Sequence, residues 1–234
     1  MATTARTARP TYSTRNVLKV WRAASADHRA RGARWYADAH DVAATIAENN
    51  GSTLAAHGAD PMARTVAAAG ILAALSPRQA WGPNVAAAAR MIADGRASRC
   101  MSDQGRKVDA ILAGAAPLEV LGGLKVRAFH ALIVSAGASL EVCVDRHAHD
   151  VAAGRVCDDA TRTALASPKT YAAIAECYIR AARIASREEG RTVTPSEVQA
   201  VTWLAWRASK GVHASADAHD VRPAARGTLA SLAA

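Results

Sequence analysis

One lysine and one aspartate stand out by their neighbours in the sequence. Lys125 follows the pair Gly122 and Gly123, and Asp145 comes twenty residues later within the phrase VDRHA. A lysine amine can attack an electrophilic carbon and form a Schiff base. A carboxylate can stabilise positive charge that develops in a transition state, or activate the attacking group. Lys125 and Asp145 are thus of residue types that can do this chemistry; the alternative is a surface lysine–aspartate pair with Asp145 as a helix cap.

The two glycines are predicted to form a hairpin between two helices, over about residues 117–137. Glycine allows the positive φ of a tight turn and the close approach of a ligand to the backbone. The N–H groups and the dipole at the start of the second helix favour a phosphate oxygen. Arg127 and His130 are expected on the polar side of that helix, where they could also contact phosphates. The alternative is that this connection is only a turn.

The charge of the whole chain points toward an acidic partner. Of 234 residues, 29 are lysine or arginine and 20 are aspartate or glutamate, so the formal net charge is +9. Such an excess favours a polyanion, most simply nucleic acid, although a generally basic proteome would also explain it. All but five of these basic residues are arginine. Arginine binds phosphate with two parallel hydrogen bonds, whereas lysine acts as a point charge.

Cysteine and histidine spacing gives no sign of a metal site. The cysteines form neither a CxxC motif nor a mixed cysteine–histidine pattern, so zinc and iron–sulfur clusters are not expected. Free thiols are expected at Cys100, Cys143, Cys157 and Cys177. The phrase AHDV occurs three times, but unequal gaps exclude a repeat, and its histidines stand in different contexts: His40, His149 and His219. We expect no metal and no cofactor.

The two ends of the chain are predicted to be flexible tails, over residues 1–14 and 215–234, around one folded domain at 15–214. The first fifteen residues lack the apolar core of a secretory signal. No apolar run reaches transmembrane length. The expected location is the cytoplasm of a bacterium or of a phage-infected host, without a membrane partner.

The pattern of the folded part predicts an all-α protein. Half of the residues are hydrophobic and only one is Phe, so alanine and branched aliphatic residues must form the core through close helix packing. Valine and isoleucine do not alternate as in strands. Helices are expected at 15–24, 31–49, 60–75, 84–95, 106–113, 117–121, 125–136, 147–153, 159–166, 168–187 and 194–211.

The order and spacing of these segments resemble the helix-hairpin-helix DNA glycosylase superfamily. In that family the hairpin ends in Gly-x-Gly-x-Lys, and the aspartate stands in a Val-Asp-x-His phrase that opens the next helix. The matching residues here are Gly123, Lys125, Val144, Asp145 and His147. The upstream stretch ALSPRQAWGPNVAAAARMI is similar to the family's Leu-Ser-x-Gln helix end and the Asn-containing helix after it. The resemblance covers roughly residues 66–153.

The resemblance implies two interleaved helical lobes, one of which carries the hairpin. It implies double-stranded DNA as the partner, with the target base turned out of the stack to reach the site. In this scheme Lys125 is the nucleophile and Asp145 the supporting carboxylate, and the hairpin glycines bind phosphate. Arg78 or Gln79 would fill the gap that the base leaves. Supporting roles in stacking and orientation fall on Trp81, Asn84 and His147, while Trp203 and Trp206 are expected in the core or between the lobes.

The sequence also departs from the family pattern. Leu121 takes the place of the hairpin's first glycine, Pro77 and Arg78 replace a small residue and glutamine, and the iron–sulfur cysteines of some members are absent. The phrases GGLKVRAF and VCVDRHA fit equally well a branch of phage enzymes, the putrescinyl-thymine pyrophosphorylase-like proteins. Three functions stay open for a protein expected to be a monomer: an N-glycosylase with possible lyase activity, a transferase that remodels modified pyrimidines in DNA, or a non-catalytic DNA-binding protein.

Overall fold

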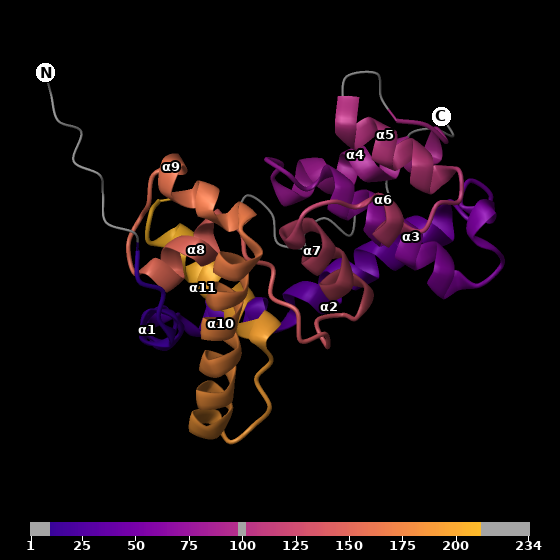
Figure 1. Cartoon of the computed structure of the whole chain (residues 1–234). Coiled ribbons are helices and arrows are strands. Elements are labelled where there is room, and N and C mark those ends of the chain that lie inside the picture. Colours follow the sequence, from indigo (N-terminus) through magenta and orange to yellow (C-terminus); the bar gives the residue numbers. More distant parts are fainter. Residues whose placement is uncertain (1–9, 98–101, 212–234) are drawn as a thin grey trace, which may run out of the picture.

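The computed structural model describes residues 10–97 and 102–211, and every regular element in them is a helix (Figure 1). The prediction of an all-α protein is therefore confirmed for this part of the chain. Cys100 and His219 lie outside it, as does the predicted tail at 215–234. The elements are α1 (Thr14–Ala23), α2 (Ala26–Asn49), η1 (Ala55–His57), α3 (Pro61–Leu75), α4 (Trp81–Ala93), α5 (Ser102–Leu112), α6 (Pro117–Val120), α7 (Leu124–Val134), α8 (Arg146–Ala153), α9 (Asp159–Arg162), η2 (Thr163–Ala166), α10 (Pro168–Glu189) and α11 (Pro195–Ala208).

Local capping sets where several of these helices begin. Asp60 accepts a hydrogen bond from the N–H of Met62 with Pro61 in the first turn, and Thr194 accepts one from the N–H of Glu197 with Pro195 next to it. Both starts agree with the sequence prediction, because a capping side chain and a proline at the first helical position act within a few residues.

Three helices begin at least three residues earlier than the sequence predicted, and one of them is α5, which starts at Ser102 rather than at 106. α2 starts at Ala26 because Ser25 accepts a hydrogen bond from the N–H of His28 and so caps the helix five residues before the predicted start. α4 starts at Trp81 rather than at 84, with Pro83 inside its first turn. A proline is tolerated there, because the first N–H groups of a helix have no partner within the helix.

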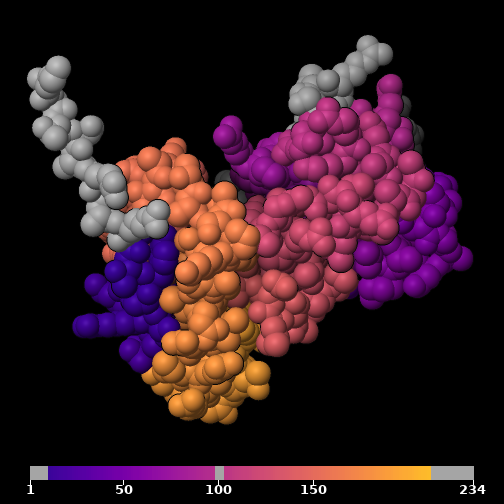
Figure 2. Space-filling model, viewed as in Figure 1, coloured from indigo at the N-terminus to yellow at the C-terminus, as the bar shows by residue number. Residues whose placement is uncertain are grey.

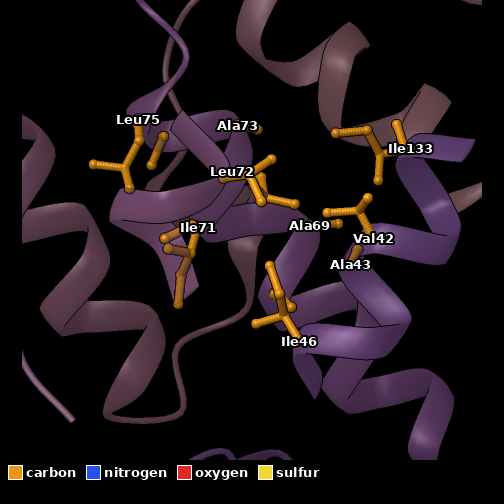
Figure 3. Close-up of a cluster of buried hydrophobic side chains, with 14 of the residues drawn as sticks. Val42, Ala43, Ile46, Ala69, Ile71, Leu72, Ala73, Leu75 and Ile133 are labelled. Atoms are coloured by element: carbon orange, nitrogen blue, oxygen red, sulfur yellow. The ribbon is translucent and has the colours of Figure 1, made fainter. Parts of the chain in front are cut away.

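The buried side chains form two clusters, which correspond to two groups of helices. One cluster packs α2, α3, α4, α5 and α7 together, and Figure 3 shows part of it around Ile46, Leu72 and Ile133. The other packs α1, α8, α10 and α11 around Trp21 and Tyr178. In Figure 1 these groups lie at opposite ends of the molecule, and α2 is the helix of the first group that packs against α11 of the second.

Alanine and glycine let the helices approach closely. From Ala67 to Leu75 α3 is buried on all sides and contains a run of fully buried alanines, so this part forms the centre of the first group. A Cβ atom on Gly32 of α2 would lie 2.4 Å from Cγ2 and 2.7 Å from Cα of Val201 in α11. Glycine is therefore needed at this crossing, where α2 joins the two groups of helices.

The folded part begins slightly earlier than the predicted tail boundary at residue 14. Tyr12 Oη lies 3.0 Å from Nε2 of His149, and the N–H of Ser13 donates to the carbonyl of Ala152 at 3.0 Å. Within the described segments, no helix combines the length and the apolar character needed to span a bilayer.

Candidate functional site

The glycine turn joins the four-residue helix α6 to α7 and is open to its surroundings. Gly123 precedes α7 with φ 77°, a conformation that glycine adopts without strain. Gly122 and Gly123 are both exposed, and a Cβ atom at either position would meet nothing within 4 Å. The turn thus needs glycine at 123 for its backbone conformation, and space remains at both positions for a ligand.

Lys125 lies in the first turn of α7 and is held by the end of α3. Its Nζ donates to Oγ of Ser76 at 3.0 Å and lies 5.3 Å from the ring centroid of Phe129. The hydroxyl of Ser76 donates in turn to the carbonyl of Ala73. Among the described residues no carboxylate forms an ion pair with Lys125, so its charge is not neutralised by the protein. The fold has brought together the Leu-Ser phrase and the hairpin lysine, 49 residues apart.

Asp145 is both the cap of α8 and a carboxylate held from a distant helix. Its Oδ1 accepts from the N–H groups of His147 and Ala148 at 2.9 and 2.8 Å. Its Oδ2 accepts from Nε1 of Trp203 in α11 at 3.0 Å. The helix cap considered as the alternative is therefore present, whereas a Lys125–Asp145 ion pair is not found in the part of the chain that the structure describes.

A row of four aromatic rings connects the surroundings of these two residues. The ring centroids of Trp203 and Trp35 are 5.5 Å apart, those of Trp35 and Trp81 5.7 Å, and those of Trp81 and Phe129 6.1 Å. This aromatic row, Trp203–Trp35–Trp81–Phe129, comes from α11, α2, α4 and α7. It has the Asp145 carboxylate at one end and the Lys125 ammonium at the other.

Trp81 is a core residue with an unusual feature. Only 9% of it is exposed, and its buried Nε1 has no hydrogen-bond partner. A buried donor without a partner costs about 1–3 kcal/mol. The structure therefore places Trp81 in the core, beside the site, with one donor unused.

Cys143 is buried close to both candidate catalytic residues, and it also lies between them in the sequence. Its Sγ contacts the carbonyl of Lys125 at 3.8 Å. Burial raises the pKa of this thiol to about 12, with the nearby charge of Asp145 adding to the effect and that of Lys125 opposing it. A thiol is a nucleophile only as the thiolate, so Cys143 fills space and does not compete with Lys125.

The loop between α3 and α4 carries the two residues expected to replace a flipped base. Arg78 and Gln79 are both exposed, and Arg78 has φ 62°. For a residue with a Cβ atom this left-handed conformation costs about 1–2 kcal/mol, and strain of this kind is concentrated at functional sites.

In Figure 2 the surface is notched between the α8–α9 region, in orange, and the α4 region, in purple.

Three of the other expected site residues have structural contacts. His130 is only 4% exposed, and its Nε2 contacts the carbonyl of Val66 at 3.2 Å. The expectation that it lies on the polar side of α7 is therefore wrong. Its burial leaves it unable to contact a phosphate in this conformation. Arg127 is exposed, but its Nη1 donates to the carbonyls of Leu118 and Leu121 and so ties α7 to the turn.

Asn84 is likewise used inside the protein. It is 2% exposed, and its Nδ2 donates to the carbonyl of Leu72 at 3.0 Å. This bond fixes α4 to α3 and thereby positions the loop that carries Arg78. Asn84 supports the site through that loop.

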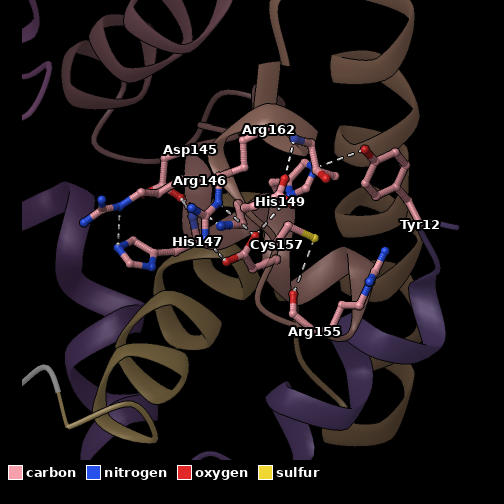
Figure 4. A network of polar contacts seen from close by, with 12 residues as sticks. Tyr12, Asp145, Arg146, His147, His149, Arg155, Cys157 and Arg162 are labelled. Atoms are coloured by element: carbon pink, nitrogen blue, oxygen red, sulfur yellow. Dashed lines mark hydrogen bonds and ion pairs between the residues drawn. The ribbon is translucent and has the colours of Figure 1, made fainter. Parts of the chain in front are cut away.

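A second polar cluster lies on the other side of α8 (Figure 4). The ligand atoms of His149, Asp150 and Cys157 lie within 4.8 Å of one another, as a metal site would require. However, Asp150 is ion-paired with Arg162 at 2.6 Å, and the two ring nitrogens of His149 contact Asp150 and Tyr12. A metal would have to displace Arg162, so we read this cluster as the tie that holds α8 to α9 and to the start of the chain.

Nothing in the local sequence pattern connects Trp203 with Asp145. It predicted Trp203 in the core or between lobes, and no local pattern indicates which residue an indole N–H 58 positions away will contact. Arg207 was missed as well, although its spacing of four from Trp203 places both on one face of α11 and its guanidinium lies 4.2 Å from that ring.

Comparison with known proteins adds a family but no activity. No curated protein and no solved structure matches the chain. One family model matches residues 1–210, nearly the whole sequence. The chain thus belongs to a family of unknown function, DUF7178.

Proposed function

We propose that the protein processes bases in double-stranded DNA, most simply as an N-glycosylase with Lys125 and Asp145 as catalytic residues. One observation carries this proposal. The lysine, free of any carboxylate partner among the described residues, and the oriented aspartate come from two segments that meet at Cys143, beside an open glycine turn. The resemblance to helix-hairpin-helix glycosylases and their two-lobed fold supports it. We further propose that the protein acts as a monomer in the cytoplasm of a bacterium or phage-infected host.

The chemistry assigns a separate step to each residue. Breaking the bond between a base and C1′ builds positive charge on the sugar, which the Asp145 carboxylate would stabilise. After losing a proton, the Lys125 amine would attack C1′, so that an N–C1′ bond forms as the base departs with the bonding electron pair. Ring opening of the sugar then yields a Schiff base.

DNA would be positioned by the exposed loops. The N–H groups at Gly122 and Gly123, together with the free N–H groups of Arg127, would hold phosphates next to the turn. Arg78 or Gln79 would occupy the gap left by the flipped base. The notch between the α8–α9 and α4 regions would admit the nucleotide (Figure 2).

One observation favours a second candidate, the transferase on modified pyrimidines. Lys125 donates to a neutral hydroxyl at 3.0 Å and forms no ion pair with a carboxylate among the described residues, which suits the binding of a phosphate or another activated anionic substituent. In that case no bond to the sugar would form. Since a fold does not determine a function, the reaction products must decide between the two.

Borohydride trapping on a panel of modified duplexes tests the proposal. A covalent adduct at Lys125 identifies a lyase, and base release without an adduct identifies a simple glycosylase. An altered base still attached to its sugar identifies the transferase. Binding with none of these products on any duplex leaves only the DNA-binding function. Lys169→Gln is the matched control for Lys125→Gln, because Lys169 is exposed at the start of α10.

A further inference from the structure

Arg207 is a cation without a partner, partly buried beside Asp145. In the described part of the chain its side chain forms no hydrogen bond and no ion pair, and its Nε is buried and unsatisfied. Its guanidinium stacks on Trp203, with 4.2 Å from Cζ to the ring centroid. Burial lowers the pKa of this guanidinium, and the nearby Asp145 carboxylate opposes that effect. A buried donor left unpaired is costly, so such a group is typical of a site that waits for an anion.

Two more cationic or titratable side chains lie around the same point. Arg146 is exposed at the start of α8, and its Nε contacts Nε2 of His147 at 3.3 Å. The ring of His147 lies edge-on to Trp203, at 6.3 Å between centroids. His147 contacts both Arg146 and the Trp203 ring, and Arg207 stacks on that same ring, so all three side chains lie around one indole.

The arrangement favours a ligand held by side chains. The N–H groups at the start of α8 are already taken by Asp145, so they cannot bind an anion directly. The positive end of the α8 dipole still adds a favourable potential at this point. Figure 4 shows Arg146 and His147 on the side of α8 away from Arg162 and Cys157, so they are separate from the ion-paired cluster.

We propose that Arg146, His147 and Arg207 bind a phosphate group next to Asp145. This inference rests on the proposed function and deepens it. Arginine binds phosphate through two parallel N–H groups. The aromatic face beneath Arg207 holds its planar guanidinium in one orientation. The substrate would then be anchored by phosphates at both ends of the aromatic row, at the glycine turn and at α8–α11. The phosphate is either a backbone phosphodiester of DNA or the diphosphate of a small reactant.

The first arm of the test measures duplex binding at several salt concentrations. Wild type is compared with Arg207→Gln, Arg146→Gln and the control Arg183→Gln, an exposed position on α10. Each neutralised phosphate contributes a slope of about 0.9 in log K against log salt. The two site variants should therefore lower the slope by about one unit each, and the control should leave it unchanged. Arg146 is exposed, so its variant keeps the test valid if Arg207→Gln folds poorly.

The second arm titrates inorganic pyrophosphate into the same four proteins by calorimetry. Binding that is lost in Arg207→Gln and Arg146→Gln but kept in Arg183→Gln supports the site with a small reactant as the source of phosphate. A changed DNA slope without pyrophosphate binding supports it with the DNA backbone as the source. Unchanged slopes together with unchanged or absent pyrophosphate binding overturn the inference. With those results the proposed function still holds if wild type processes bases. A wild type that does not bind DNA overturns the proposed function but not, by itself, the phosphate site.

Discussion

The substitution Asp145→Asn separates the roles of this residue most sharply. The two carboxylate oxygens serve three N–H donors, two in α8 and one on Trp203. Asparagine keeps one oxygen for the helix cap, and Asn caps about as well as Asp. Its NH2 group must then face the Trp203 N–H, so two donors meet and the indole loses its acceptor.

The expected cost follows from these contacts. An unsatisfied donor of this kind costs about 1–3 kcal/mol, and loss of the negative charge at the α8 start adds about 0.3–1 kcal/mol. We expect the free energy of unfolding to fall by about 2 kcal/mol. In a chain of this size each kcal/mol lowers the thermal midpoint by about 2–4 °C.

A double-mutant cycle with Trp203→Phe isolates the contact. Without the indole N–H, Asp145→Asn should cost only the loss of charge, so the two substitutions couple by about 1–2 kcal/mol in denaturant unfolding. Strict additivity would refute the assigned contact. In the activity assay Asp145→Asn should abolish product formation while DNA binding stays equal or becomes tighter, and a fully active variant would exclude the catalytic role.

Further predictions concern the lysine, the loop and the buried histidines. Lys125→Gln should lose any borohydride adduct and product formation, whereas an unchanged yield with only a shallower salt slope would reduce Lys125 to a phosphate contact. Arg78→Gly should raise the unfolding free energy by about 1 kcal/mol by relieving the left-handed conformation yet slow processing of duplex DNA; an unchanged rate in kinetic assays argues against the wedge. Burial lowers the pKa of His130 and His147 from 6.5, so the unfolded chain binds more protons and stability should fall as pH drops below about 6.5. His130→Gln, which can keep a donor for Val66, should make that loss shallower in denaturant titrations, and an unaltered pH profile would contradict it.

The sequence predicted well the features that depend on neighbouring residues. The capped starts of α3 and α11, the glycine turn before Lys125 and the cap at Asp145 each follow from side chains within about four positions. Which polar residues are buried was harder to predict from the sequence, because residue type alone places a histidine on the polar face of a helix. His130 instead fills a space beside α3 and bonds to Val66, a contact created by tertiary packing.

The contacts between distant helices could not be predicted from local pattern. Lys125 meets Ser76 because α7 packs against α3. Asp145 meets Trp203 because α8 packs against α11. The isolated charge of Arg207 is likewise visible only in three dimensions, because its neighbours come from α8. The early start of α2, by contrast, is a local feature, because the cap at Ser25 lies directly before the helix.

The most direct test of base processing at the aromatic row is a mass-spectrometric product assay on duplexes with a range of modified bases. Wild type and Lys169→Gln should release or alter one class of base, while Lys125→Gln and Asp145→Asn bind the same duplex and yield no product. The account is contradicted if wild type leaves every base intact, or if both site variants turn over at the wild-type rate.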